Sequence, residues 1–167
     1  AGGTVLPAGE SLHITPNLAS FRSRTTSPTG AEGRFVVGPY SGHLSNFGES
    51  LVISNASGTP VASTSYTGTP SDPQLYLVVS ELHYHPAGNP AAEFIELLNI
   101  SNTVTLDLSG VKFSAGIDFD FSTAQITSLP PGERVLIVRD TAAFEAVYGH
   151  SQSARIAGTF ANDTVLT

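Results

Sequence analysis

Two histidines separated by one residue are the first side chains in this sequence that could do chemistry. His83 and His85 would lie on one face of an extended strand, and Glu81 would share that face because side chains alternate along a strand. Imidazole and carboxylate groups in this arrangement could hold a zinc or copper ion. The alternative is that the two histidines only mark the end of a strand.

Three aspartates form a second candidate metal site. Asp118 and Asp120 alternate with apolar residues over 117–121, and Asp107 precedes them in the chain. Carboxylate oxygens are the ligands that Ca²⁺ prefers. The usual Asp-x-Asp-x-Asp-Gly loop is absent, and aspartates that alternate with inward-facing apolar residues also fit the solvent face of a strand. We therefore expect no cofactor, with calcium as the alternative.

Three glutamates could supply the carboxylate pair of a general acid–base catalyst. Glu81, Glu93 and Glu96 fall within one short stretch of the chain. The sequence has no Cys, no Gly-x-Ser-x-Gly elbow and no phosphate-binding loop, so no nucleophile or nucleotide motif accompanies them. We predict that the chain is not an enzyme.

Three Asn-x-Ser/Thr triplets, which begin at Asn55, Asn99 and Asn162, match the acceptor for N-linked glycans. They matter only in a host that glycosylates proteins. A chain rich in Ser and Thr contains such triplets by chance, so they carry no functional prediction.

The charge of the chain argues against several classes of partner. It has 7 basic and 14 acidic residues and a net charge of −7. Affinity for nucleic acid comes mostly from Lys and Arg side chains that neutralise phosphates, so we expect no nucleic-acid partner. No stretch approaches the roughly 18 apolar residues that suggest a membrane span. Without Cys there is no disulfide and no thiolate metal site.

Short strands between turns dominate the elements that the residue pattern predicts. In the back half of the chain, Thr141 to Tyr148 is predicted as a helix that ends at Gly149. In the front half, Asn17 is predicted to cap one helical turn over 17–21. The predicted strands are 11–15, 34–37, 50–54, 61–66, 75–85, 93–99, 104–108, 111–114, 117–121 and 134–139.

Several of these segments resemble a known family. The string Ser80 to Pro86, the strand 93–99 and the turn Asp107 to Gly110 resemble the opening of the lamin tail domain. The resemblance implies an all-β, immunoglobulin-like β-sandwich with at most one or two short helices. Similar bacterial domains have Tyr-His-Pro or Tyr-Asn-Pro at a strand end, which favours the strand-end interpretation of the histidines. The acidic positions among the three glutamates likewise recur as part of that fold.

An internal repeat organises the chain. Residues 6–10, Leu-Pro-Ala-Gly-Glu, match residues 129–133, Leu-Pro-Pro-Gly-Glu, and Phe21 matches Phe144 at the same separation of 123 positions. Residues 1–45 and roughly 124–167 are therefore interpreted as two copies of one segment, taken from the middle of the lamin tail pattern. Residues 46–72 resemble the end of that pattern, and residues 75–123 resemble its beginning.

This order predicts the back of one module followed by the front of another. We assign 1–72 to the C-terminal part of a first lamin-tail-like module, 73–74 to a linker and 75–167 to the N-terminal part of a second. The alternative is one permuted sandwich. Because the chain starts Ala-Gly-Gly, with neither Met nor a signal sequence, we expect a processed or partial product.

The resemblance implies a non-enzymatic structural or adhesive module of a bacterial cell-surface or secreted protein. We expect a tandem array or fibre whose partners are neighbouring copies or modules, joined by strand pairing at open sheet edges. The alternative is a carbohydrate- or calcium-binding accessory module attached to a secreted enzyme. A nuclear intermediate-filament tail is disfavoured because the sequence has no coiled-coil heptads.

Overall fold

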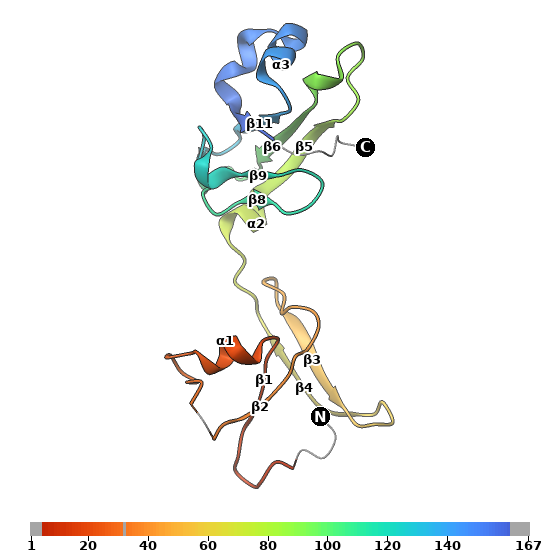
Figure 1. Ribbon diagram of the computed structural model, residues 1–167, viewed down its shortest axis with the longest axis vertical. Helices are drawn as coiled ribbons and strands as arrows, with labels where there is room; N and C mark the ends of the chain where they lie inside the picture. Colours follow the sequence, from red (N-terminus) through yellow and green to blue (C-terminus); the bar gives the residue numbers. More distant parts are fainter. Residues whose placement is uncertain (1–4, 32, 161–167) are drawn as a thin grey trace. The chain divides into compact units, whose positions relative to one another are not determined.

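The computed structural model describes residues 5–31 and 33–160. The chain divides into two compact units, Ala1–Gly68 and Thr69–Thr167, which we call the first and second unit. Figure 1 shows the chain coloured along the sequence, and each unit is treated by itself below. No helix in these two described ranges is long and apolar enough to cross a membrane.

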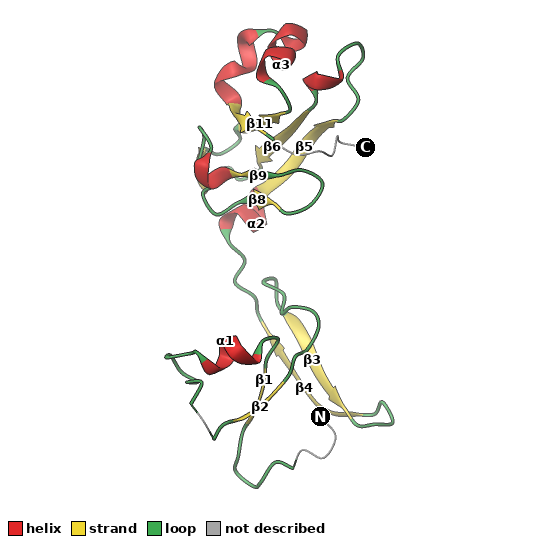
Figure 2. Cartoon of the chain, in the orientation of Figure 1, coloured by secondary structure: helices red, strands yellow, loops and turns green. Residues whose placement is uncertain are grey.

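The first unit consists of a parallel strand pair and an antiparallel hairpin (Figure 2). The parallel strands β1 (Leu12–Ile14) and β2 (Phe35–Val37) are separated in the chain by helix α1 (Leu18–Arg22). The hairpin is formed by β3 (Glu49–Ser54) and β4 (Pro60–Tyr66) around an Asn55–Gly58 turn.

Helix α1 begins where the sequence predicts. The side chain of Asn17 accepts a hydrogen bond from the backbone N–H of Ser20 at 2.9 Å, which satisfies one of the free donors at the helix start. The helix buries Phe21, whose ring lies 5.3 Å from the ring of His13 on β1. Phe21 thus packs the helix against β1.

The second unit contains a four-stranded sheet in the order β12-β11-β6-β5, faced by two short strand pairs, β10-β7 and β8-β9. Short helices join several of these strands. The bounds are α2 (Asp72–Tyr76), β5 (Leu77–His83), η1 (Pro90–Ala92), β6 (Phe94–Asn99), β7 (Leu106–Asp107), β8 (Lys112–Phe113), β9 (Phe119–Asp120), η2 (Phe121–Thr123), β10 (Ser128–Leu129), β11 (Arg134–Val138), α3 (Thr141–Tyr148), η3 (His150–Arg155) and β12 (Ile156–Thr159).

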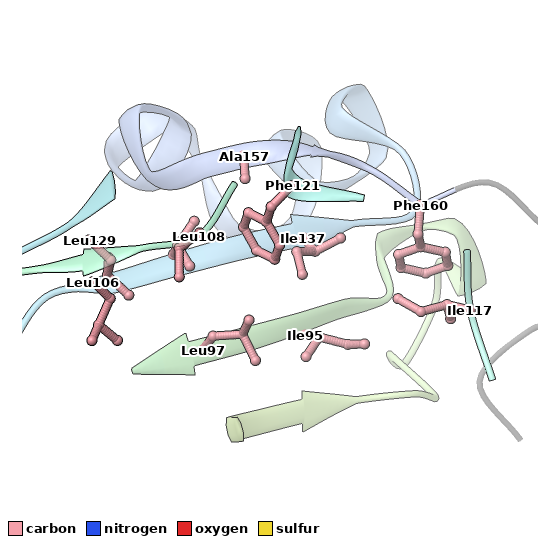
Figure 3. Packing of buried hydrophobic residues seen from close by; sticks show 11 residues of the cluster. Ile95, Leu97, Leu106, Leu108, Ile117, Phe121, Leu129, Ile137, Ala157 and Phe160 are labelled. Atoms are coloured by element: carbon pink, nitrogen blue, oxygen red, sulfur yellow. The ribbon is translucent and has the colours of Figure 1, made fainter. Parts of the chain in front are cut away.

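Strand β6 is an inner strand of the four-stranded sheet, and side chains on both of its faces are buried. Ile95 and Leu97 point into the main core, where Ile137 of β11 lies beside them (Figure 3). The short strands and η2 close this core from the other side. The buried side chains on that side come from these elements and the loops between them, and they are Leu106, Leu108, Ile117, Phe121 and Leu129.

The opposite face of the sheet is covered by helix α3. Phe94 packs there in a second cluster with Phe144, and their rings meet edge to face at 5.4 Å. The helix is capped at both ends, and its bounds and terminal glycine are those that the sequence predicts. Asp140 accepts a hydrogen bond from the N–H of Ala143 at 2.8 Å, and Gly149 adopts φ +76° just after Tyr148.

Two predictions for the start of this unit are wrong. The predicted strand 75–85 begins at Leu77 and ends at His83, because Leu75 and Tyr76 belong to helix α2. The predicted linker 73–74 also lies inside α2, and the segment without regular structure precedes it, at 67–71. The helix forms here because the side-chain carbonyl of Gln74 accepts a hydrogen bond from the N–H of Ser71 at 3.0 Å.

The two sequence copies have the same local fold. Each is a strand, a capped helix and a second strand parallel to the first, formed by β1-α1-β2 and by β11-α3-β12. The cap Asn17 corresponds to Asp140, and the buried Phe21 corresponds to Phe144. The registers agree at one pair, because His13–Val36 takes the place of Leu136–Ile156, and they then differ, because β11 and β12 have a register shift after Leu136.

Candidate functional site

The two histidines lie at and beyond the end of β5. The His83 ring stacks on the Phe94 ring at 5.3 Å with an interplanar angle of 1°, and meets the edge of Tyr148 at 5.9 Å. Burial and the nearby Glu81 carboxylate raise the pKa of the Tyr148 hydroxyl. His85 is exposed, beside Tyr84. His83 therefore packs against the aromatic cluster under α3, and metal binding by this pair stays a prediction.

The three aspartates are engaged locally. Asp107 accepts a hydrogen bond from the N–H of Ser109 at 2.9 Å, and Asp120 accepts one from Ser122 at 2.8 Å. Interactions with these serines hold the pKa of both carboxyls below the ordinary value. Asp118 and Asp120 line a hollow of about 510 Å³ that also contains Lys112.

The described residues contain no preformed cluster of metal ligands. Within residues 5–31 and 33–160, no three His, Asp or Glu side chains group in a way that could hold a metal ion. Asp107 is thus not brought together with the other two aspartates as a triad. Calcium binding stays a prediction.

The three glutamates lie along the sheet rather than around a cavity. Glu96 pairs with Arg134 at 3.0 Å and accepts a hydrogen bond from the Ser80 hydroxyl at 2.7 Å. Glu81 lies opposite Glu96 on the neighbouring strand. Glu93 is buried and lies 3.5 Å from Arg139, while its second oxygen, Oε2, has no hydrogen-bond partner among the described residues. Glu96 and Glu93 thus each lie beside an arginine, Arg134 and Arg139 respectively.

One open apolar surface was missed by the sequence analysis. On the β3–β4 hairpin, Leu51 and Ile53 lie opposite Thr64 and Ala62 in the register, so these four side chains share one face, which we call the hairpin face. The face borders a hollow of about 440 Å³, also lined by Ile14 of β1. Ile53 is 60% exposed.

The opposite side of the same hairpin is more polar, although it also carries Val52, which is 56% exposed. The Ser50 and Ser65 hydroxyls lie across from each other there and share a hydrogen bond at 2.9 Å. The hairpin therefore has one apolar face and one mixed face. The alternation was hard to see in the sequence because Val52 makes the apolar run Leu51 to Ile53 continuous.

A second open surface lies on β5. Val79 is paired with Leu97, and Leu82 is paired with Ile95, so both point to the side of the sheet that carries the main core. They are nevertheless 57% and 53% exposed. We call these two side chains the β5 patch. A register shift between Val79 and Glu81 places both on this side.

The repeat shows that the position of Ile14, which lines the hollow beside the hairpin face, is buried in the other copy. Ile14 of the first copy corresponds to Ile137 of the second copy, at the same separation as Phe21 and Phe144. Ile137 is fully buried by the strands around it, whereas Ile14 is 60% exposed. Among the described residues of the first unit, this core position thus has no layer like the one that covers its counterpart.

Comparison with known proteins gives one match. A family model described as Lamin Tail Domain matches residues 70–166, which is more than half of the chain. No curated protein and no solved structure matches. The matched region includes every described strand of the second unit.

Proposed function

Because the chain belongs to the lamin tail domain family, whose fold is immunoglobulin-like, we propose that it is a non-enzymatic structural or adhesive module of a bacterial cell-surface or secreted protein. The predicted family and all-β fold class are confirmed. The observation that carries the proposal is the pair of open apolar surfaces, the hairpin face and the β5 patch, one on each unit. Open apolar faces and sheet edges are where such modules join others.

The contacts of the charged side chains support a non-enzymatic role. Glu96 and Glu93 lie beside arginines, and His83 is stacked on Phe94. These groups tie together strands of the sheet and the helix over it. A catalytic pair needs instead to converge on a cavity where a substrate can sit.

The edges of the sheets support association with neighbouring copies by strand pairing. β5 ends the four-stranded sheet, and β3 and β4 form a sheet of only two strands, so each offers backbone groups to another strand. Charged side chains that would block such pairing are sparse, with Glu81 on β5 and Glu49 at the start of β3. These strands are suited to pairing.

Localisation in the source organism tests the proposal. Antibodies raised against the chain should label intact cells or detect the protein in the culture medium, and external protease should remove the signal from intact cells. A cytosolic enzyme probed in the same samples is the control for lysis. Detection only after the cells are broken would contradict a surface or secreted role.

A further inference from the structure

We propose that the hairpin face of one copy docks on the β5 patch of a second copy, with Leu51 and Ile53 covering Val79 and Leu82. The inference deepens the proposed function, on which it rests, by naming the partner of each open surface. The docked hairpin adds a strand layer over apolar side chains that stay exposed in the described residues of each unit.

The hairpin needs a cover. An isolated two-stranded hairpin is marginally stable in water unless its apolar face is packed against another layer. In the described part of the first unit, Ile53 and Ile14 remain largely exposed around a hollow of about 440 Å³. Burying such side chains gains roughly 25 cal/mol for each Å² of apolar surface removed from water.

The β5 patch is the matching gap in the second unit. On the core side of the sheet, β6 and β11 are covered, and Leu97 and Ile137 are almost fully buried. The covering layer does not extend over β5, where Val79 and Leu82 remain exposed. A two-stranded apolar layer placed there would continue the sandwich across the whole sheet.

The distribution of charge indicates which surfaces meet. Residues 1–68 contain three basic and three acidic residues, whereas residues 69–167 contain four basic and eleven acidic residues. A contact between two second units would bring like charges together. A first unit can approach a second unit without that repulsion. The charges therefore disfavour a second unit as the partner of the β5 patch and leave a first unit, which has no net charge, as its partner.

Such a contact uses different surfaces on the two copies. It is heterologous, so each added copy leaves one hairpin face and one β5 patch free for the next. The expected assembly is an open, head-to-tail chain of copies.

Sedimentation velocity of the full chain tests the contact. The wild-type chain should grow beyond a dimer as its concentration rises from about 1 to 500 μM, a range in which weak association can be detected. Leu51→Asp removes the hairpin face and Leu82→Asp removes the β5 patch. Each variant alone should associate at least about tenfold more weakly, because a charge would be buried in the contact.

An equimolar mixture of the two variants gives the sharpest outcome. The intact hairpin of Leu82→Asp can dock on the intact β5 patch of Leu51→Asp, and the resulting pair has no functional surface left. The mixture should therefore form dimers that do not grow, at concentrations where each variant alone associates at least about tenfold more weakly than the wild type. A contact between identical surfaces would not show this complementation.

Two exposed residues outside the contact provide matched controls. Leu18 is 41% exposed on α1 and does not line the hollow, and Ile100 is 50% exposed after β6. Leu18→Asp and Ile100→Asp should associate as the wild type does. Far-UV circular dichroism checks that every variant is folded, and Ile53→Asp and Val79→Asp serve as second variants on the two surfaces.

Three results would overturn the inference: a wild-type monomer at every concentration, association unaffected by all four surface variants, or a mixture that stays monomeric. None of them bears on where the protein is found in cells. A protein confined to the cytosol would instead defeat the proposed function, whatever the sedimentation shows.

Discussion

Asn99 connects two segments of the second unit, 101–104 and 129–130, through one side chain. Its Nδ2 donates hydrogen bonds to the carbonyl oxygens of Val104 at 2.8 Å and of Leu129 and Pro130 at 3.0 Å, and its Oδ1 accepts one from the N–H of Ser101 at 2.9 Å. The side chain is fully buried. Removing it would leave several buried polar groups without partners.

We expect Asn99→Ala to lower the free energy of unfolding of the second unit by about 3 kcal/mol, because each unsatisfied buried group costs roughly 1–3 kcal/mol. Urea denaturation followed by circular dichroism measures the change. Asn102→Ala, three residues away on the surface, is the control and should have almost no effect. Equal stabilities for the two variants would contradict the role of this network.

The same residue shows a limit of local motifs. Asn99 begins one of the three glycosylation triplets, yet its amide is engaged inside the fold, whereas Asn55 is exposed in the hairpin turn. Asn162 lies outside the described residues. A triplet reports residue types but carries no information about burial. Similarly, the sequence could suggest His83 as a ligand but could not reveal the Phe94 ring stacked on it.

Helix α3 was predictable to the residue because its signals are local. An apolar pair four residues apart and a terminal glycine both point to the same bounds, and the structure adds a capping aspartate that the sequence analysis did not single out. Helix α2 was missed because Leu75 and Tyr76 favour strands, and the local start signals at Ser71 and Pro73 outweighed that preference. Element bounds thus followed the sequence where local signals agreed.

The packing of α3 gives a prediction at this scale. Phe144→Ala should destabilise the second unit by about 3–5 kcal/mol, because the buried ring contacts Phe94 and Tyr148 and its loss leaves a cavity. Val147→Ala on the same helix is 44% exposed and should change stability by less than about 0.5 kcal/mol. The thermal unfolding midpoint of each variant measures the difference. A similar shift for both would mean that the helix is not docked through Phe144.

For the whole molecule, the repeat allows the same position to be tested in two surroundings. Ile137→Ala should cost the second unit about 2–5 kcal/mol, because the side chain is fully buried. Ile14→Ala should change stability by less than about 0.5 kcal/mol, since Ile14 is 60% exposed. Urea denaturation should be done at low concentration, so that association does not cover Ile14. Equal costs would show that the first unit is closed in solution.

The repeat and the family were readable from the sequence, because they depend on short strings in a fixed order. The exposed surfaces were not, since Leu51 and Ile53 look like ordinary core residues of a strand. Whether such a residue is covered depends on strands far away in the chain, which pattern and propensity do not specify. The division into module parts stays a prediction, whereas the boundary between the compact units lies at Gly68 and Thr69.

The strand order of the second unit also determines how it responds to pulling. β5 and β12 are the two outermost strands, and the antiparallel and parallel pairings place Leu77 and Thr159 at opposite ends of the sheet. Tension that enters at Leu77 and leaves at Thr159 therefore acts along the strands, across the direction of the ladder hydrogen bonds. The bonds of each ladder are loaded in shear together instead of opening one by one from an end. Because forced unfolding depends on the unfolding barrier, this geometry makes the unit resistant to tension applied along its own chain.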